Sequence, residues 1–405
     1  MGWVLEIPFL EFPSYVKQLA ADFEPVFEQK RQLQQFERLM SAFPVAERHS
    51  IAHMNGMFTY HTNQSNLNRF VTQSGWDASE LQKIAVDMVN MVEKDGMLAI
   101  DDTIVEKTGK EMYGVEWHFD HSKGKSVWGM SIADCVFIGN GIYPVASSIY
   151  VRREGRWSAD FKTKMELQKE NIGTLAAAGL HFSCVLMDSW YLAGELLGYI
   201  RSLGKDWIAE AKENRLVRHN GGWVHLSEFA AAHSSLLNTV LTVNGNRYMA
   251  HPFTVNMKGM GRVRLVVSLN RHGNFKLLVS NRLDWDERDI IGRYSARWDI
   301  EVWHKEGKGQ YGLEECRLRS DDGASKYLAL SCCADILLEI ASLLSPVYAS
   351  LTHPGRTPDM KRRWIVLEAV GQLISAASGA KTAEVRNIME GILTPYRSTM
   401  KFMRG

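Results

Sequence analysis

The chain has 405 residues, of which 45% are hydrophobic and 23% charged, and its formal net charge at pH 7 is +1. This composition excludes a disordered or low-complexity protein, and so small a net charge argues neither for nor against a nucleic-acid partner. The length is sufficient for two or three structural units with large apolar cores.

The cysteines and the apolar segments indicate in which cellular compartment the protein is expected. Five cysteines show no C-x-x-C motif and no zinc-binding spacing, which is typical of buried free thiols in a reducing cytosol. The first residues lack a basic region and contain Glu6 and Glu11, so they do not match a signal peptide. Residues 327–348 are the most apolar segment, but Asp335 and Glu339 favour a buried helix over a membrane span. We therefore expect a cytoplasmic protein without a membrane partner.

Residues 1–95 have the apolar spacing of short helices. The predicted helices lie at 27–43, 44–57, 64–72 and 77–92. Asp77 and Glu80 stand at the start of the last one in the manner of a capping box. The pattern is compatible with a helix-turn-helix DNA-binding domain and also with a plain structural bundle.

At Gly96 the pattern changes to strands and helices in the order β, β, β, α, β, α, β. The predicted strands are 97–100, 126–138, 141–151, 182–187 and 207–211, and the predicted helices are 161–178 and 192–202. Gly139-Asn140-Gly141 between the second and third strands is a hairpin signal. An antiparallel meander followed by crossovers to parallel strands matches the ribonuclease H-like fold.

Residues 212–285 return to short strands separated by glycine-containing turns. The predicted strands are 223–226, 247–251, 253–257, 262–269 and 275–280. Ten basic residues lie between Lys212 and Arg282, and only Glu213 and Glu228 oppose them. A basic segment within a neutral chain predicts a local surface for a polyanion.

A helical region follows this insertion. The predicted helices are 289–308, 324–344, 364–378 and 382–392, with a linker at 350–358. The chain as a whole is predicted to be an α/β protein with a ribonuclease H-like catalytic core. We divide it into an N-terminal helical DNA-binding domain (1–95), the core (96–211 and 286–320), a β-strand insertion subdomain (212–285) and a C-terminal helical region for dimerisation or DNA contact (321–405).

The predicted helix at 289–308 has an unusual face. At 100° per residue, one side within roughly 80° carries no aliphatic residue. It consists of Tyr294, Arg297, Glu301, Lys305 and Lys308. An amphipathic core helix would place leucine and isoleucine on an aligned face. The alternative is a solvent-exposed face with i,i+4 ion pairs, such as Glu301 with Lys305.

Three acidic positions belong to elements of this predicted fold. Asp101 or Asp102 follows the first strand, Asp188 follows the fourth, and Glu301 lies on the helix. The first and fourth strands of a meander fold are neighbours, so we expect Asp101 and Asp188 side by side. Adjacent carboxylates repel each other unless a cation lies between them. Simple turn or helix-capping roles are the alternative for both aspartates.

Carboxylate oxygens are the ligands that Mg²⁺ and Mn²⁺ prefer. Two such ions about 4 Å apart can activate a nucleophile and stabilise the leaving oxygen of a phosphodiester. The attacking group would be water or a DNA 3′-hydroxyl.

These residues resemble the motifs of a known family, the insertion-sequence DDE transposases of bacteria and archaea that carry the YREK signature. Tyr294-x2-Arg297-x3-Glu301-x6-Lys308 matches that signature. Asp101-Asp102-Thr103 is similar to the first-aspartate motif of the family, and Val185-Leu-Met-Asp188 is similar to the second. The resemblance covers roughly residues 60–320.

The resemblance implies cut-and-paste transposition. The enzyme would bind terminal inverted repeats in double-stranded DNA, cleave the element from flanking DNA and join its 3′ ends to target DNA. Two Mg²⁺ ions, for which Mn²⁺ can substitute, would be held by Asp101, Asp188 and Glu301. Asp101 is preferred to Asp102 because the acid-x-Thr motif aligns on it.

The resemblance also implies DNA contacts and an assembly. Phosphates of the transposon end would be held by Tyr294, Arg297 and Lys308, and further contacts would come from Lys305, His304 and Trp298. Core packing is the alternative role for Trp298. We expect a homodimer in the synaptic complex, associated with the bacterial or archaeal nucleoid.

Some members of the family form a DNA hairpin and stack a flipped base on an aromatic residue of the insertion. The candidates here are Trp223, Tyr248, Phe275 and Trp285, with core packing as the alternative for each. Two other functions remain open: a ribonuclease H-like DNA nuclease without strand transfer, and a non-enzymatic DNA-binding protein descended from a transposase.

Overall fold

The computed structural model describes residues 7–120, 123–243, 245–270, 272–344 and 358–379. The chain divides into two compact units. Unit 1 comprises Met1–Met88, Val105–Val115 and Lys305–Gly405, and unit 2 comprises Val89–Ile104 and Glu116–His304. The predicted helix at 382–392 lies outside the described residues, as does the predicted linker at 350–358 except for residue 358.

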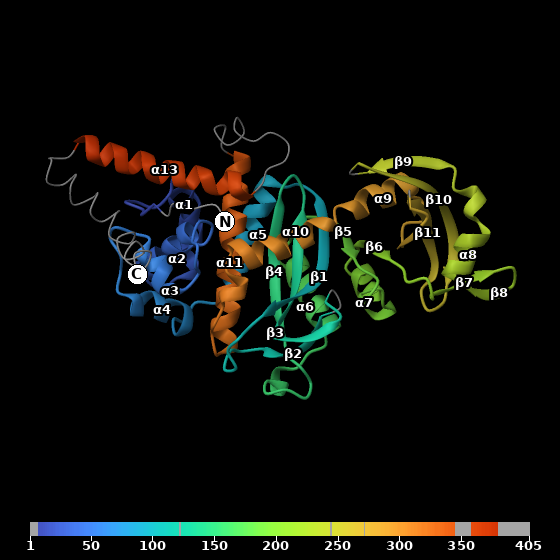
Figure 1. Ribbon diagram of the computed structural model, residues 1–405, viewed down its shortest axis with the longest axis horizontal. Helices are drawn as coiled ribbons and strands as arrows, with labels where there is room; N and C mark the ends of the chain where they lie inside the picture. Colours follow the sequence, from blue (N-terminus) through green and yellow to red (C-terminus); the bar gives the residue numbers. More distant parts are fainter. Residues whose placement is uncertain (1–6, 121–122, 244, 271, 345–357, 380–405) are drawn as a thin grey trace, which may run out of the picture. The chain divides into compact units, whose positions relative to one another are not determined.

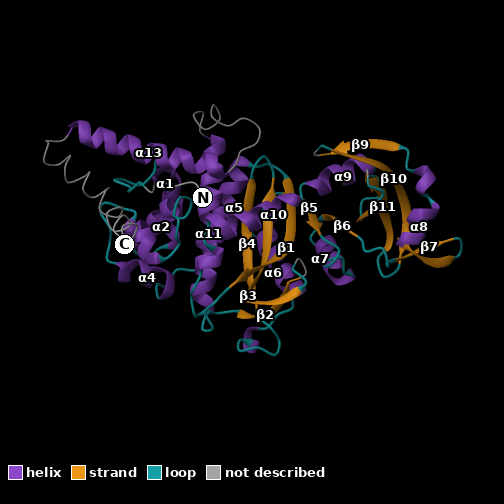
Figure 2. Ribbon diagram, in the orientation of Figure 1, coloured by secondary structure: helices purple, strands orange, loops and turns teal. Residues whose placement is uncertain are grey.

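Unit 1 is mainly helical (Figure 2). Its helices are α1 (Ser14–Leu19), η1 (Ala20–Val26), α2 (Lys30–Ala42), α3 (Ile51–Gly56), α4 (Gln64–Thr72), most of α5 (Ala78–Val92), η4 (Leu313–Glu315), α11 (Asp321–Leu344) and α13 (Pro358–Gly379). Helices α1, α2 and α4 pack on α11. The predicted helix at 44–57 is wrong in its first half, because Ser50 caps α3 by accepting a hydrogen bond from the His53 backbone amide at 3.2 Å.

Helix α11 is the core helix of unit 1. Among the described residues it alone is long and apolar enough to cross a membrane, with a mean hydropathy of 1.8. However, 83% of its apolar window is buried inside the protein. This burial confirms the prediction of a buried helix in this segment.

Unit 2 is built on a mixed sheet, and this confirms the predicted α/β class. Its described strands follow the order β2-β3-β1-β5-β6-β12-β11-β10-β7-β8, with β4 paired to β3 and β9 paired to β10. The first strands along the chain are β1 (Gly96–Glu106), β2 (Val115–Asp120), β3 (Lys125–Ile138), β4 (Ile142–Tyr150), β5 (Phe182–Met187) and β6 (Asp206–Glu210). Strand β1 is parallel to β5, β5 is parallel to β6, and β3 forms a hairpin with β4.

The inserted strands continue this sheet, because β12 pairs antiparallel to β6 (Figure 1). They are β7 (Leu216–His219), β8 (Gly222–His225), β9 (Thr239–Val243), β10 (Asn246–Met257), β11 (Gly261–Asn270) and β12 (Phe275–Ser280). The helical elements of the unit are η2 (Ser158–Asp160), α6 (Lys164–Ala177), α7 (Gly194–Ser202), α8 (Leu226–Ala232), η3 (Ser234–Leu236), α9 (Glu287–Ser295) and the first half of α10 (Trp298–Gln310). Helix α6 packs against β3 and β4.

Two strand predictions need correction. Strand β1 continues to Glu106, so Asp101 and Asp102 lie within a strand and not after one. The predicted strands 247–251 and 253–257 are one strand, β10. Pro252 pairs with Val266 of β11, while β9 ends its pairing with β10 at Ala250, so the missing N–H faces a side that no strand occupies there.

The predicted hairpin is confirmed, and a buried acid holds its turn. Ile138 of β3 pairs with Ile142 of β4. Glu93, which is 1% exposed, accepts hydrogen bonds from the Gly141 backbone amide and the Tyr143 hydroxyl, each at 2.9 Å. The side-chain amide of Asn140 donates to it at 3.0 Å. A single carboxylate therefore satisfies several donors of the turn.

We expect Glu93→Ala to lower the stability of the protein by about 3 kcal/mol, because it leaves buried donors of the turn unsatisfied. The measurement is the midpoint of urea unfolding followed by tryptophan fluorescence. The exposed Glu228→Ala serves as the control and should shift the midpoint little. Equal midpoints for the two variants would show that Glu93 does not hold the turn.

Candidate active site

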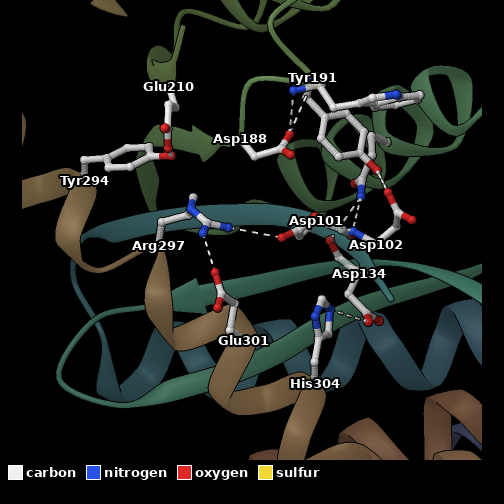
Figure 3. A network of polar contacts seen from close by, with 12 residues as sticks. Asp101, Asp102, Asp134, Asp188, Tyr191, Glu210, Tyr294, Arg297, Glu301 and His304 are labelled. Atoms are coloured by element: carbon white, nitrogen blue, oxygen red, sulfur yellow. Dashed lines mark hydrogen bonds and ion pairs between the residues drawn. The ribbon is translucent and has the colours of Figure 1, made fainter. Parts of the chain in front are cut away.

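Two neighbouring parallel strands bring Asp101 and Asp188 together. Ile100 of β1 pairs with Met187 of β5; Asp101 is the next residue of β1, and Asp188 is the first residue after β5. The paired residues are fully buried, as expected for strands covered on both faces. The predicted adjacency of Asp101 and Asp188 is confirmed (Figure 3).

Asp188 also organises the turn that follows β5. Its Oδ1 accepts hydrogen bonds from the backbone amides of Trp190 at 2.9 Å and Tyr191 at 3.2 Å. The turn role that we considered as an alternative is therefore real. It coexists with the position beside Asp101, because these bonds engage one carboxylate oxygen.

The predicted helix at 289–308 is wrong as a single helix. Helix α9 ends at Ser295, and α10 begins at Trp298. Between them, the backbone amide of Arg297 bonds to the carbonyl of Tyr294 at 3.0 Å, and that of Ile300 bonds to the carbonyl of Arg297 at 3.2 Å. These i→i−3 bonds replace the i→i−4 bonds of an α-helix and tighten the backbone at Arg297.

Arg297 links two of the three acids (Figure 3). Its Nη1 lies 3.1 Å from Oδ2 of Asp101, and its Nη2 forms an ion pair with Oε1 of Glu301. The Arg297 side chain is 14% exposed, compared with 21% for Asp101 and 36% for Glu301. A single half-buried guanidinium thus compensates both carboxylates.

The pKa values of this cluster reflect the burial of its charged groups. Burial, with a smaller effect of Asp188, raises the pKa of Asp101 to about 6, although His304 and Arg297 lower it. Burial also raises the pKa of Asp188 above its usual range, although its two backbone hydrogen bonds lower it. Burial lowers the pKa of Arg297, but the neighbouring Tyr294, Asp101 and Glu301 outweigh burial and raise it.

Asp102 has different partners from Asp101. It forms an ion pair with Lys164 of α6 and accepts a hydrogen bond from the Tyr191 hydroxyl at 3.1 Å. Figure 3 shows Asp102 and Tyr191 on one side of the Asp101–Asp188 pair and Tyr294 with Glu210 on the other. Of the two neighbouring aspartates, Asp101 is the one that shares Arg297 with Glu301.

Tyr294 is 5% exposed, and its hydroxyl donates to Oε2 of Glu210 at 3.5 Å. Burial raises the pKa of Tyr294, so its hydroxyl stays neutral. Lys276 of β12 lies 3.3 Å from the same Glu210 oxygen and 5.1 Å from the centre of the Tyr294 ring. Glu210 therefore holds both a phenol and an ammonium group beside the acids.

A pocket of about 370 Å³ adjoins Arg297 between the insertion strands and α9. Its lining combines aromatic rings with two cations. These side chains include Tyr248, Lys276, Tyr294, Arg297 and Trp298. Trp298 is 62% exposed, so the alternative of core packing for this residue is wrong. Of the four aromatic residues considered for stacking a flipped base, Tyr248 lines this pocket. Trp285, another of the four, is only 9% exposed.

His304 is paired with a buried acid. Its Nε2 lies 3.1 Å from Oδ2 of Asp134, a residue of β3 whose side chain is fully buried. Ser147 of β4 donates a hydrogen bond to the other Asp134 oxygen. This pairing fastens α10 to the sheet one turn after Glu301. Lys305 and Lys308 follow in the second half of the helix, which belongs to unit 1.

Sequence reasoning missed four charged residues of this site. They are Asp134, Lys164, Glu210 and Lys276. A usable signal existed only for Asp134, which is a single acid in the apolar run of β3. The others lie at element ends, where a charged residue is ordinary.

The two neighbouring carboxylates of Asp101 and Asp188 are the oxygen ligands that a hard divalent cation prefers, and Arg297 pairs with only the first of them. Within the described part of the chain, however, no three acidic, histidine or cysteine side chains are grouped closely enough to hold a metal ion. The guanidinium of Arg297 lies between Asp101 and Glu301. A metal ion bound by both acids would have to take this place.

Comparisons with known proteins identify the family. The model of the archaeal putative transposase family ISC1217 matches residues 141–343, half of the chain's 405 residues. The model of the DDE superfamily endonucleases matches residues 22–136. The chain belongs to the archaeal putative transposase family ISC1217. A comparison with curated proteins finds no match.

Two solved structures are similar to the chain over most of its length. A piggyBac transposase synaptic complex with hairpin DNA has a TM-score of 0.45 and 11% identity, over 94% of this chain and 84% of that one. A Drosophila P element transposase strand transfer complex has a TM-score of 0.22 and 11% identity, over 91% and 73%. Because both TM-scores are below 0.5, the assignment rests on the family models.

The raised pKa of Asp101 predicts a pH-dependent stability. In an unfolded chain this carboxyl titrates near its usual 3.8, and in the folded protein near 6. Between these values the folded state holds a proton that the unfolded state has lost, so raising the pH through this window costs the folded state about 3 kcal/mol. Asp101→Asn cannot ionise and should therefore be more stable than the unmutated protein at pH 8, with a difference that vanishes near pH 4.

Thermal unfolding midpoints from pH 4 to pH 8, measured with a chelator present, test this expectation. The exposed Asp87→Asn is the matched control and should show no comparable gain. A lower midpoint for Asp101→Asn than for the unmutated protein at pH 8 would contradict the raised pKa of Asp101.

Proposed function

We propose that the chain is a cut-and-paste DNA transposase. It binds terminal inverted repeats, cleaves the element from flanking DNA and joins the 3′ ends to a target. The observation that carries this proposal is the placement of Asp101 and Asp188 on neighbouring parallel strands, with Glu301 tied to Asp101 through Arg297. Membership of a putative transposase family supports it.

A ribonuclease H-like core is part of the proposal. The strand order β4-β3-β1-β5-β6, with β1, β5 and β6 parallel and β3 antiparallel to β4, supports this fold. Asp101 belongs to the central strand β1, and Asp188 follows its parallel neighbour β5. The inserted strands 212–285 leave this core after β6 and return before α9.

Asp101, Asp188 and Glu301 would hold Mg²⁺ or Mn²⁺ in the proposed reaction. Such ions polarise the scissile phosphodiester and its attacking oxygen when bound. For the acids to accept a cation, Arg297 has to release Asp101 or Glu301. A released guanidinium is suited to bidentate contact with a phosphate of the transposon end. In the proposed reaction Arg297 therefore pairs first with the carboxylates and then with a DNA phosphate.

The other proposed DNA contacts lie on α9 and α10. Tyr294 holds its phenol as a neutral donor, and Lys305 and Lys308 follow Glu301 along α10. Exposed Trp298 can stack on DNA, whereas buried His304 orients the helix through Asp134. The proposed partners are double-stranded DNA and a second copy of the chain in a synaptic complex, in the cytoplasm.

Metal-dependent cleavage of terminal inverted-repeat DNA tests the chemistry. We expect Asp188→Ala and Glu301→Ala each to lower the cleavage rate by about 1,000-fold or more, because a carboxylate of the proposed metal site is removed. DNA binding should persist in both variants. The measurement is cleavage of labelled repeats, taken from the DNA flanking the gene, with Mg²⁺ or Mn²⁺ in gel assays.

Glu228→Ala is the matched control, since this exposed glutamate lies outside the acidic cluster. Binding without any cleavage by the unmutated chain would reduce the protein to a DNA-binding role. Cleavage without joining to a plasmid would make it a nuclease of the same fold.

The pocket beside Arg297 is proposed to hold an unpaired base at the cleaved end. Tyr248 and Trp298 supply ring faces, and Lys276 with Arg297 supplies charge for the attached phosphates. Stacking on an aromatic side chain is worth about 1–3 kcal/mol per base, which offsets the cost of unstacking.

Replacing either ring should weaken this stacking. In Tyr248→Ala and Trp298→Ala we expect cleavage to fall by about 10–100-fold, which corresponds to the loss of one stacked base. A 2-aminopurine placed at the transposon end should lose its protein-dependent quenching in the same variants. Tyr248→Phe retains the ring and should retain the quenching. Unchanged quenching in both alanine variants would exclude the pocket as the base site.

A further inference from the structure

A second charged surface lies next to the acids, outside the basic insertion. Residues 150–164 contain five basic and two acidic side chains, interleaved with aromatic rings. We define the basic–aromatic band as Tyr150, Arg153, Phe161, Lys164 and Trp190. It lies on the segment that connects β4 to α6 and on the turn after β5.

The side chains of the band form a continuous series of contacts. The guanidinium of Arg153 lies 5.2 Å from the Phe161 ring centre, and that ring meets Tyr150 edge-on at 6.4 Å. The ammonium of Lys164 lies 5.5 Å from the Tyr150 ring and 6.0 Å from the Trp190 ring. The series therefore joins two cations and three rings.

One end of the band reaches the acidic cluster. Lys164 forms an ion pair with Asp102, and the backbone amide of Trp190 donates to Asp188. Asp102 lies on the side of the Asp101–Asp188 pair opposite to Tyr294 (Figure 3). The band and the pocket beside Arg297 thus flank the acids on opposite sides.

A buried carboxylate holds the connecting segment in shape. Glu116 of β2, which is 7% exposed, accepts hydrogen bonds from the backbone amides of Arg152 at 2.7 Å and Arg156 at 3.1 Å. A Cβ atom on Gly155 would lie 1.5 Å from a Glu116 oxygen, so any other residue there would displace this carboxylate. The segment is preorganised, and a ligand need not order it on binding.

Folding alone does not account for the composition of this surface. Trp190 is 46% exposed, although a tryptophan ring gains stability from burial. Exposed Arg153 has no carboxylate within 4 Å among the described residues, and its guanidinium lies over the half-buried Phe161 ring. Half-buried Lys164 lies over the exposed Trp190 ring. Cations beside aromatic rings are the features that bind phosphates and stack on bases.

We propose that the basic–aromatic band binds DNA on the side of the scissile phosphodiester opposite to the pocket. This inference rests on the proposed function, because a DNA strand that crosses the acids has to continue on both sides. Two DNA segments have the required chemistry: flanking DNA before cleavage and target DNA during joining. Both present phosphates to Arg153 and Lys164 and bases to the rings.

Charge reversal at the exposed end of the band tests the proposal. Arg153→Glu should weaken binding to one of two DNAs by about 10-fold: a repeat duplex extended by flanking DNA, or a target duplex. The slope of log affinity against log salt concentration should become shallower by about one, which corresponds to the loss of one phosphate contact. Binding of a repeat duplex that ends at the cleavage position should stay within about twofold, since that DNA does not reach the band. Phe161→Leu should show the same pattern, and Arg153→Lys should restore binding.

Arg201→Glu is the matched control, because Arg201 is exposed on α7 and lies outside the band. A loss confined to flank-containing duplex with slower cleavage assigns the band to flanking DNA. A loss confined to target duplex with slower joining of precut ends assigns it to target DNA. Unchanged affinity for both overturns the proposal.

The binding measurements need no catalysis and are made without divalent ions. An unmutated chain that binds flank or target through Arg153 but never cleaves would therefore refute the transposase proposal and leave the band intact. If the unmutated chain cleaves and joins DNA, and Arg153→Glu binds flank and target with the same affinity, the transposase proposal stands and the band proposal is refuted.

Discussion

Parallel pairing forces two acidic side chains together, and the site depends on how their charge is compensated. Because Ile100 is in register with Met187, Asp101 and Asp188 leave adjacent strands at the same level. Burial raises the pKa of both carboxyls, and their mutual repulsion adds to this for Asp101. Arg297 supplies the nearest compensating guanidinium and also reaches Glu301. The backbone break between α9 and α10 occurs at the residue that makes these contacts.

One guanidinium cannot stay on two carboxylates and also bind a phosphate. In the proposed function, a divalent cation at the acids and a phosphate at Arg297 replace the contacts seen here. Cation binding and DNA binding would then favour each other, because each releases a partner of the other. His304 and Asp134 hold α10 on the sheet, so Glu301 can keep its position when Arg297 moves.

The surroundings of the acids are asymmetric. On one side, Tyr294, Lys276 and the pocket combine rings with cations, and Glu210 pairs with both a phenol and an ammonium group. On the other side, Lys164 is held by Asp102 and belongs to a series of rings and cations whose two ends, Arg153 and Trp190, are exposed. Carboxylates that pair with these cations limit repulsion within the folded protein. In the proposed function, DNA phosphates compete with these carboxylates for the cations on both sides of the acids.

Local patterns in the sequence were sufficient for much of this architecture. The apolar run of β5, the helical spacing of α4 and the Gly139-Asn140-Gly141 turn depend on near neighbours, and the structure confirms all three. The adjacency of Asp101 and Asp188 also followed, because strand order in a meander limits which strands can pair. Tertiary structure alone decided the break at Arg297, the continuity of β10 through Pro252, and the partners of Asp102, Asp134 and Glu210. Those features depend on which residues distant in sequence supply a charge or leave a strand edge open, and a local pattern carries no record of them.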